Sequence, residues 1–89
     1  MTGWLRARRK EARRVTLYTK QDCGLCREAE DALRRIQKKA RFELELVDIE
    51  ADPAISSRYW DRVPVVAVDG KEVAMAPIDE TRLRSLLRA

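Results

Sequence analysis

The order in which the hydrophobic pattern changes along the chain restricts the fold more than any other feature of the sequence. Residues 15–19 are β-branched and aromatic and predict a short strand. Residues 24–39 then place apolar side chains at spacings of three and four, which is typical of one face of a helix. Residues 42–50 alternate apolar and acidic side chains and predict a second strand. A strand, a helix and a strand this close together predict a right-handed crossover between two parallel strands.

The second half of the chain predicts a helix followed by a hairpin. The Asp-Pro pair at residues 52–53 opens the helix, because it supplies a capping side chain and then proline at the first helical position. Residues 63–68, VPVVAV, predict a third strand. The Asp-Gly pair at residues 69–70 is typical of a two-residue hairpin turn, and residues 71–75 predict the returning fourth strand.

A last helix completes the predicted fold. Asp79 is a suitable N-cap, and Leu83, Leu86 and Leu87 then lie on the inner face of the helix. The element order is therefore β-α-β-α-β-β-α, which predicts an α/β fold with a mixed four-stranded sheet. We expect helices on both faces of so small a sheet, because each apolar face must be covered.

The net charge of +4 is concentrated at the start of the chain. Residues 1–14 carry six of the 19 basic residues and a single acid, Glu11. The remaining residues then hold 13 basic and 14 acidic side chains, so they are almost neutral. We therefore predict a basic N-terminal extension at 1–14 followed by one compact domain at 15–89, since 89 residues suffice for one domain but not for two.

Charge and hydropathy also bear on partners and location. The excess of basic residues is not spread over a folded face with interleaved aromatic side chains, so we expect no nucleic-acid partner. No apolar segment follows the basic residues, as it would in a signal peptide. The longest apolar stretch, residues 63–68, has the length of a strand and not of a membrane span. We expect a cytoplasmic monomer that does not bind membranes.

Both cysteines of the chain lie in one short stretch, KQDCGLC, at Cys23 and Cys26. A structural zinc site needs four ligands, which in a chain without histidine would require two chains, so we expect no metal. Covalent haem attachment would need histidine where this chain has Arg27. A structural disulfide would close a very small loop and add little stability. A redox-active pair is the remaining interpretation, and its position between a strand and a helix favours it.

The two cysteines are expected to have different roles. Cys23 lies at the start of the predicted helix, where unpaired backbone N–H groups favour a thiolate. Cys26 lies one turn further along and should be more buried. Cys23 would attack a disulfide, and Cys26 would then resolve the mixed disulfide. Lys20 and Arg27 add positive charge near Cys23, and Asp22 opposes them.

Over residues 15–88 the sequence resembles the glutaredoxin family of the thioredoxin fold, more closely its short bacterial glutaredoxin-like members. The likeness rests on the stretches YTKQDCGLCREAE, ELVDIEADP and RVPVVAVDGKEV. It implies that Pro64 follows a cis peptide bond and faces the cysteines. It also implies that the backbone of Val63 pairs with a substrate strand. The partners implied are disulfide-containing proteins, with thioredoxin reductase or glutathione as electron donor.

The sequence departs from the family pattern at the residues around the cysteines. Gly24 and Leu25 stand where the family usually has proline and an aromatic residue, and Arg62 replaces a threonine. The stretch EVAMAPIDE replaces a Gly-Gly pair that makes room for glutathione. We expect weak use of glutathione, with Lys20 and Arg62 as candidate anchors for a carboxylate and Leu25 as a contact for the partner.

The predicted function is that of a thiol–disulfide oxidoreductase without a bound cofactor, whose Cys23–Cys26 dithiol reduces protein or low-molecular-weight disulfides. Two alternatives are also compatible with the sequence. In the first, the cysteines of two chains hold an iron–sulfur cluster across a dimer, because thiolates are the usual ligands of such clusters. In the second, the chain is a redox-inactive adaptor with the thioredoxin fold.

Overall fold

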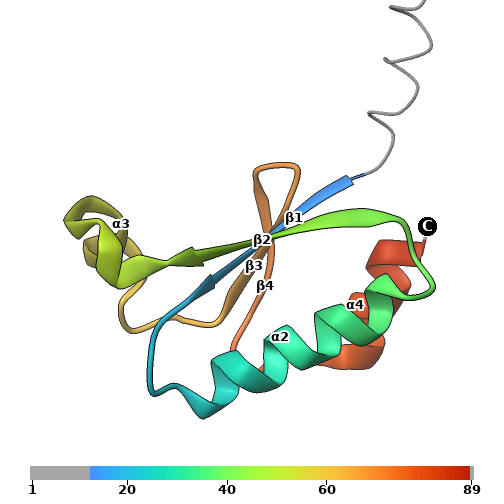
Figure 1. Cartoon of the computed structure of the whole chain (residues 1–89), viewed down its shortest axis with the longest axis horizontal. Helices are drawn as coiled ribbons and strands as arrows, with labels where there is room; N and C mark the ends of the chain where they lie inside the picture. The colour runs from blue at the N-terminus through green and yellow to red at the C-terminus, as the bar shows by residue number, and fades with distance from the viewer. Residues whose placement is uncertain (1–12, 89) are drawn as a thin grey trace, which may run out of the picture.

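The structure is a computed structural model, and it describes residues 13–88. The elements follow the predicted order β-α-β-α-β-β-α, with one turn of 3₁₀ helix, η1, after the second strand (Figure 1). Their bounds are β1 Arg13–Thr19, α2 Gly24–Gln37, β2 Phe42–Asp48, η1 Ile49–Ala51, α3 Pro53–Tyr59, β3 Val65–Val68, β4 Lys71–Met75 and α4 Glu80–Arg88. No helix within these residues has both the length and the apolar character needed to cross a membrane.

The four strands form one mixed sheet in the order β2-β1-β3-β4. β1 and β2 are parallel, as the predicted crossover through α2 requires, and they pair along their full length. β3 runs antiparallel to β1, and β4 runs antiparallel to β3. The fold class predicted from the sequence is therefore confirmed.

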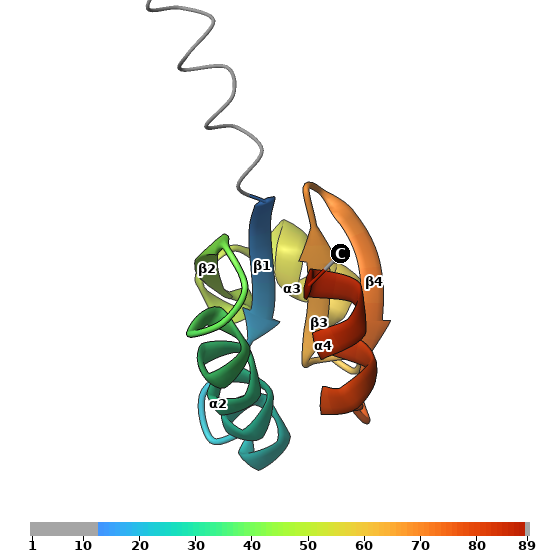
Figure 2. The ribbon, with the colours of Figure 1, turned by 90° about the vertical axis from the view of Figure 1, so that its right-hand side faces the viewer.

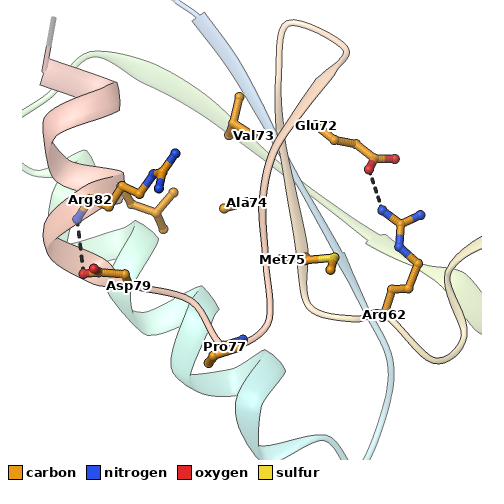
Figure 3. A pocket seen from close by; sticks show the side chains of 9 residues that line it. Arg62, Glu72, Val73, Ala74, Met75, Pro77, Asp79 and Arg82 are labelled. Atoms are coloured by element: carbon orange, nitrogen blue, oxygen red, sulfur yellow. Dashed lines mark hydrogen bonds and ion pairs between the residues drawn. The ribbon is translucent and has the colours of Figure 1, made fainter.

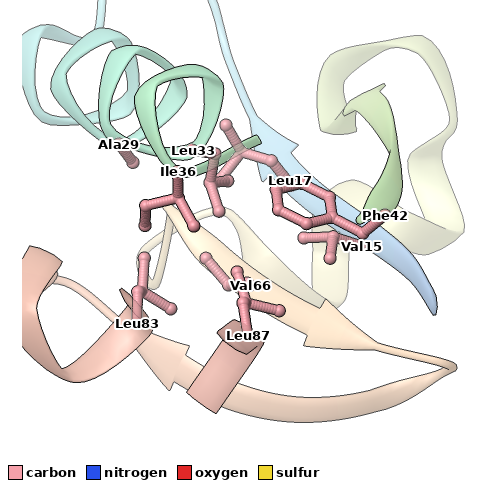
Figure 4. Packing of buried hydrophobic residues seen from close by; sticks show 9 residues of the cluster. All are labelled: Val15, Leu17, Ala29, Leu33, Ile36, Phe42, Val66, Leu83 and Leu87. Carbon is pink, nitrogen blue, oxygen red and sulfur yellow. The ribbon is translucent and has the colours of Figure 1, made fainter. Parts of the chain in front are cut away.

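The helices cover both faces of the sheet, because neighbouring residues of a strand point to opposite sides. On β1, Leu17 belongs to the core beneath α2 and α4, while Tyr18 packs in the smaller cluster beside α3. On β3, Val66 likewise belongs to the core beneath α2 and α4, and Val65 belongs to the smaller cluster beside α3. In Figure 2, α2 and α4 lie in front of the sheet and α3 lies behind it. Figure 4 shows the larger core, in which Leu33, Ile36, Leu83 and Leu87 meet the strands.

The turn between β3 and β4 matches its sequence signature and also fixes the start of β1. Asp69 and Gly70 both have positive φ values, 52° and 86°, as a two-residue hairpin turn of this kind requires. The Asp69 carboxylate accepts a hydrogen bond from the backbone N–H of Arg14 at 3.0 Å. Arg13 and Arg14, assigned above to the basic extension, are therefore part of the sheet. The rest of that predicted extension, residues 1–12, lies outside the described residues.

Two strand boundaries and the buried face of one helix differ from the sequence-based expectation, each for a local reason. β2 ends at Asp48, whose carboxylate accepts from the N–H of Glu50 at 2.9 Å and so begins η1. β3 begins only at Val65, because Pro64 has no N–H to donate to a ladder. The prediction that Leu86 lies on the inner face of α4 is wrong, since its side chain is 37% exposed. Leu83 and Leu87, four residues apart, form the buried stripe instead.

Candidate redox site

The two cysteines lie where β1 leads into α2, and they are joined by a disulfide with Cα atoms 5.2 Å apart. Cys23 is the N-cap of α2, with an extended backbone at φ −125° and ψ 103°. Its Sγ accepts a hydrogen bond from the backbone N–H of Cys26, with 3.2 Å between nitrogen and sulfur. The sulfur thus takes the place that serine or aspartate oxygens usually take at a helix start. An electron-rich sulfur is stabilised there by the free N–H groups and the helix dipole.

The two sulfurs differ in their access to solvent. Cys26 is only 2% exposed, because it lies on the buried face of α2 together with Ala29 and Leu33. Cys23 is half-buried and lines a surface pocket. The expected asymmetry between an outer and an inner cysteine is therefore present in the geometry.

The loop before Cys23 depends on a conformation that the sequence analysis missed. Asp22 has a φ of 55°, in the left-handed region that few residues other than glycine, asparagine and aspartate adopt readily. This residue turns the chain so that Cys23 can cap α2. The backbone N–H of Gln21 also donates to the carboxylate of Glu50 at 3.4 Å, which ties the loop to η1. The signal in the sequence is an aspartate directly before a helix N-cap, since aspartate is one of the few residues that adopt this conformation readily.

A polar pocket of about 330 Å³ opens over the disulfide. Its lining comprises Thr19, Lys20, Gln21, Asp22, Cys23, Cys26, Arg27 and Glu30. The structure therefore brings Lys20 and Arg27 to the same pocket as both cysteines. Leu25 points outward and is 52% exposed, so an apolar group stands beside the disulfide. The Cβ that Gly24 lacks would have no atom within 4 Å, so the site is open on that side too.

Val63 and Pro64 lie in the segment that enters β3. Pro64 is buried and follows a cis peptide bond, and its carbonyl accepts from the N–H of Ala76 at 3.0 Å. Val63 is half-buried against Tyr59 and Val65. The hydrogen bond to Ala76 holds this segment against the chain that leaves β4.

Arg62 is not part of the pocket over the disulfide. Its Nη2 lies 2.6 Å from the Oε1 of Glu72, and its guanidinium stacks 5.3 Å above the ring of Tyr59. Figure 3 shows this ion pair at the side of a separate pocket along β4, which Met75 and Arg82 also line. Of the two cations proposed as carboxylate anchors, the structure brings Lys20 to the cysteines and engages Arg62 elsewhere.

The cluster that engages Arg62 is built around Tyr59. The Tyr59 hydroxyl donates to the Oε2 of Glu72 at 2.9 Å, and its ring stacks on Tyr18 with centroids 4.3 Å apart. Burial and the hydrogen bond to Glu72 raise the pKa of Tyr59 to about 12. The hydrogen bond from Arg62 holds the pKa of Glu72 below its usual range. These contacts join residues from three elements, and no spacing in the sequence indicates them.

Within residues 13–88, no three histidine, cysteine, aspartate or glutamate side chains are grouped as a metal ion would require. The chemistry that the described site offers is that of its two sulfurs. The sulfur of Cys23 is accessible and accepts the backbone N–H of Cys26, and Cys26 itself is buried.

The sequence of this chain matches a family of proteins whose description agrees with the fold and with the paired cysteines. The family described as Glutaredoxin-like domain (DUF836) matches residues 14–88. An uncharacterized protein of Mycobacterium tuberculosis (strain ATCC 25618 / H37Rv) is 29% identical over 76 residues, covering 80% of this chain and 78% of that protein.

Solved structures show the same fold. The protein Ne2328 from Nitrosomonas europaea superposes with a TM-score of 0.73 at 33% identity, covering 85% of this chain and 92% of that one. A structural-genomics target protein from X. campestris gives a TM-score of 0.69 at 39% identity, covering 82% and 93%. A thioredoxin mutant from Halobacterium salinarum gives 0.67 at 21% identity, covering 93% and 79%, and this likeness bears on the fold alone.

Proposed function

The chain belongs to the Glutaredoxin-like domain family, and from that premise we propose that it is a dithiol–disulfide oxidoreductase that reduces protein or low-molecular-weight disulfides. One observation carries the proposal. The sulfur of Cys23 accepts the N–H of Cys26 at the start of α2, while Cys26 itself is buried. A sulfur in this position is favoured as a thiolate and remains accessible to a second disulfide.

The reaction begins with the reduced protein. The Cys23 thiolate attacks one sulfur of a substrate disulfide, which breaks the substrate S–S bond and releases the other sulfur as a thiolate. The Cys26 thiol then loses its proton and attacks the Sγ of Cys23, which forms the internal disulfide and releases the second substrate thiolate. Two electrons have passed to the substrate, and the released thiolates take up two protons. An external reductant, thioredoxin reductase or glutathione, restores the dithiol without a bound cofactor.

The remaining site residues would position the substrate. The backbone of Val63 beside the buried Pro64 would pair with an extended substrate segment, and the exposed Leu25 would contact its side chains. Lys20 would attract a carboxylate close to Cys23. We propose that protein disulfides are preferred over glutathione, because the ion pair of Arg62 with Glu72 leaves only Lys20 of the two anticipated anchors beside the cysteines.

The experiment that tests the function is the reduction of insulin by purified protein with an excess of dithiothreitol. We expect faster precipitation of the insulin B chain than with dithiothreitol alone, and no acceleration by the Cys23→Ser variant. A wild-type rate equal to that of dithiothreitol alone would contradict the proposal and favour the redox-inactive adaptor. A brown dimer with visible absorption after anaerobic reconstitution would favour the iron–sulfur alternative instead.

A further inference from the structure

A groove runs between α2 and α4, beginning beside the redox cysteines. Its near half is a pocket of about 310 Å³ that starts at Leu25, one of the two residues between the cysteines. Ala29, Ala32, Pro77 and Ile78 give this half an apolar floor. Its far half is a pocket of about 470 Å³ that ends at Arg88.

The two halves are separate pockets that meet at an ion pair, because Arg35 of α2 and Glu80 of α4 line both pockets and pair across the groove. The Arg35 guanidinium contacts the Glu80 carboxylate through two hydrogen bonds, Nη2 to Oε1 at 2.8 Å and Nε to Oε2 at 3.1 Å. Arg84 adds a third contact, to the Oε2 of Glu80 at 3.2 Å. The charge of Glu80 is therefore already matched within the protein.

The charges that remain have opposite signs at the two ends of the groove. In the near half, Glu28 and Asp31 are exposed and form no ion pair within 4 Å in the described part of the chain. The pKa of the Arg35 guanidinium is raised first by its hydrogen bond to Glu80 and also by the charge of Asp31, which lies nearby. In the far half, Lys39 and Arg88 are equally without an ion pair among residues 13–88. Acidic residues near a helix N-terminus are often explained by a favourable interaction with the helix dipole, but that interaction falls off within the first turn. The first turn of α2 contains no acidic residue, so the dipole does not explain the presence of Glu28 and Asp31.

We propose that this groove binds the segment of a protein substrate next to the reacting cysteine, and that it selects segments with a defined charge order. The segment carries an apolar residue and basic residues within about three positions of its cysteine, and acidic residues about five to seven positions away. This inference rests on the proposed function. Charge complementarity selects the occupant, since a basic stretch meets Glu28 and Asp31 while an acidic stretch meets Lys39 and Arg88.

The length of the groove agrees with such a segment. The groove starts at Leu25 on α2 and reaches Lys39, in the turn just beyond the end of α2 at Gln37. A helical rise of about 1.5 Å per residue makes the helical part, from Leu25 to Gln37, roughly 18 Å long, and the turn adds a few ångströms. An extended chain advances about 3.3 Å per residue, so about six or seven residues span the groove. The apolar residue of the segment would then lie on Leu25 and Ile78 when the substrate disulfide is at Cys23.

Synthetic peptides test the inference. Each peptide holds its single cysteine in a mixed disulfide with 2-nitro-5-thiobenzoate. The Cys23 thiolate attacks the peptide sulfur and releases the coloured thiobenzoate, after which Cys26 attacks Cys23 and releases the peptide thiolate. One peptide has the basic residues near the cysteine and the acidic residues far from it, and its partner has the reverse order at equal net charge. Each peptide is made in two versions, one with the charged segment on the N-terminal side of the cysteine and one with it on the C-terminal side.

We expect the second-order rate constant of the matching peptide to exceed that of its reverse by about tenfold at low salt, as the sum of several weak exposed pairs, and by much less at about 1 M salt. The double variant E28K/D31K should abolish or invert this preference. The double variant E43K/E45K changes the net charge equally on a different strand, β2, and should keep the preference. A preference within twofold of unity in wild type, or an equal loss in both double variants, would overturn the inference.

The symmetrical disulfide of 2-nitro-5-thiobenzoate, which carries no peptide, tests the proposed function independently of the groove. Rapid exchange with that small disulfide, without a charge-order preference among the peptides, would overturn the groove assignment and leave the oxidoreductase proposal standing. Failure to exchange with any disulfide, large or small, would overturn the proposed function and the groove assignment with it.

Discussion

The backbone N–H of Cys26 donates a hydrogen bond to the Sγ of Cys23 across 3.2 Å, within a pair of residues that are also joined by a disulfide. The same N–H remains in place when the disulfide is reduced, because it belongs to the first turn of α2. An N–H in this position favours a thiolate over a thiol, which supports the attacking role that we propose for Cys23. Cys26 is only 2% exposed and lies behind Cys23 on the buried face of α2.

The first prediction concerns these two roles. The Cys26→Ser variant should accumulate a stable mixed disulfide on Cys23, because no second sulfur is available to release the bound substrate thiol. The Cys23→Ser variant should form none. Mass spectrometry after reaction with oxidised glutathione measures both adducts. An adduct on Cys26 in the Cys23→Ser protein, formed at a similar rate, would contradict the assignment.

The second prediction is that Gly24→Pro stabilises the protein. Gly24 is the first residue of α2, the position where proline is most readily accepted, and its missing Cβ would meet no atom within 4 Å. Cys23 already has the extended backbone that a residue before proline prefers. The free energy of unfolding should rise by about 0.4–1 kcal/mol, because the unfolded chain loses conformational entropy.

Urea unfolding of the oxidised proteins measures the effect of Gly24→Pro. Gly24→Ala is the matched control, since it adds a Cβ without restricting φ to the same extent, and it should give a smaller gain. Destabilisation by both variants would show that the chain around Gly24 is more tightly constrained than the structure indicates.

The third prediction concerns pH. The pKa of Tyr59 is raised to about 12 in the folded protein and is about 10 in an unfolded chain. The folded state therefore holds the Tyr59 proton more tightly, and stability is lost as the pH rises above about 10. Tyr59→Phe should be less stable than wild type by about 1 kcal/mol at pH 8, because the hydrogen bond to Glu72 is lost.

The stability gap between Tyr59→Phe and wild type should narrow as the pH rises from 9 toward 11, since only wild type has the Tyr59 proton to lose. Urea unfolding across this range measures the gap. Tyr18→Phe is the control for general effects of alkali on the stacked rings, and its stability relative to wild type should change less with pH. A constant gap for Tyr59→Phe would rule out the coupling of Tyr59 ionisation to folding.

The fourth prediction separates the two cations considered as glutathione anchors. Lys20→Ala should lower the rate of exchange with oxidised glutathione about two- to fivefold, because one exposed charge contributes up to about 1 kcal/mol. Arg62→Ala should change that rate by less than twofold, since Arg62 is paired with Glu72 away from the disulfide pocket. Stopped-flow kinetics of the reduced proteins measure both, and a larger effect of Arg62→Ala would place its side chain at the substrate.

The local features of the fold could be predicted from the sequence because their contacts are made within a few residues. The Asp52 carboxylate accepts the N–H of Ala54 at 2.9 Å, and Asp79 accepts that of Thr81 at 3.0 Å, so both helix starts follow from residue types and spacing. The Asp69–Gly70 turn and the place of Cys23 at the start of α2 are equally local.

The contacts between residues far apart in the sequence were decided only by the tertiary structure. Arg62 meets Glu72 ten positions away, and Arg35 meets Glu80 forty-five positions away. Spacing cannot indicate such pairs, because every exposed arginine in the sequence has several acids that its flexible side chain could reach in some arrangement of the elements. The sheet order and the docking of α4 against α2 select one acid for each arginine. The sequence by itself thus determined which elements form and where the sulfurs lie in them, whereas packing determined which charges remain unpaired around them.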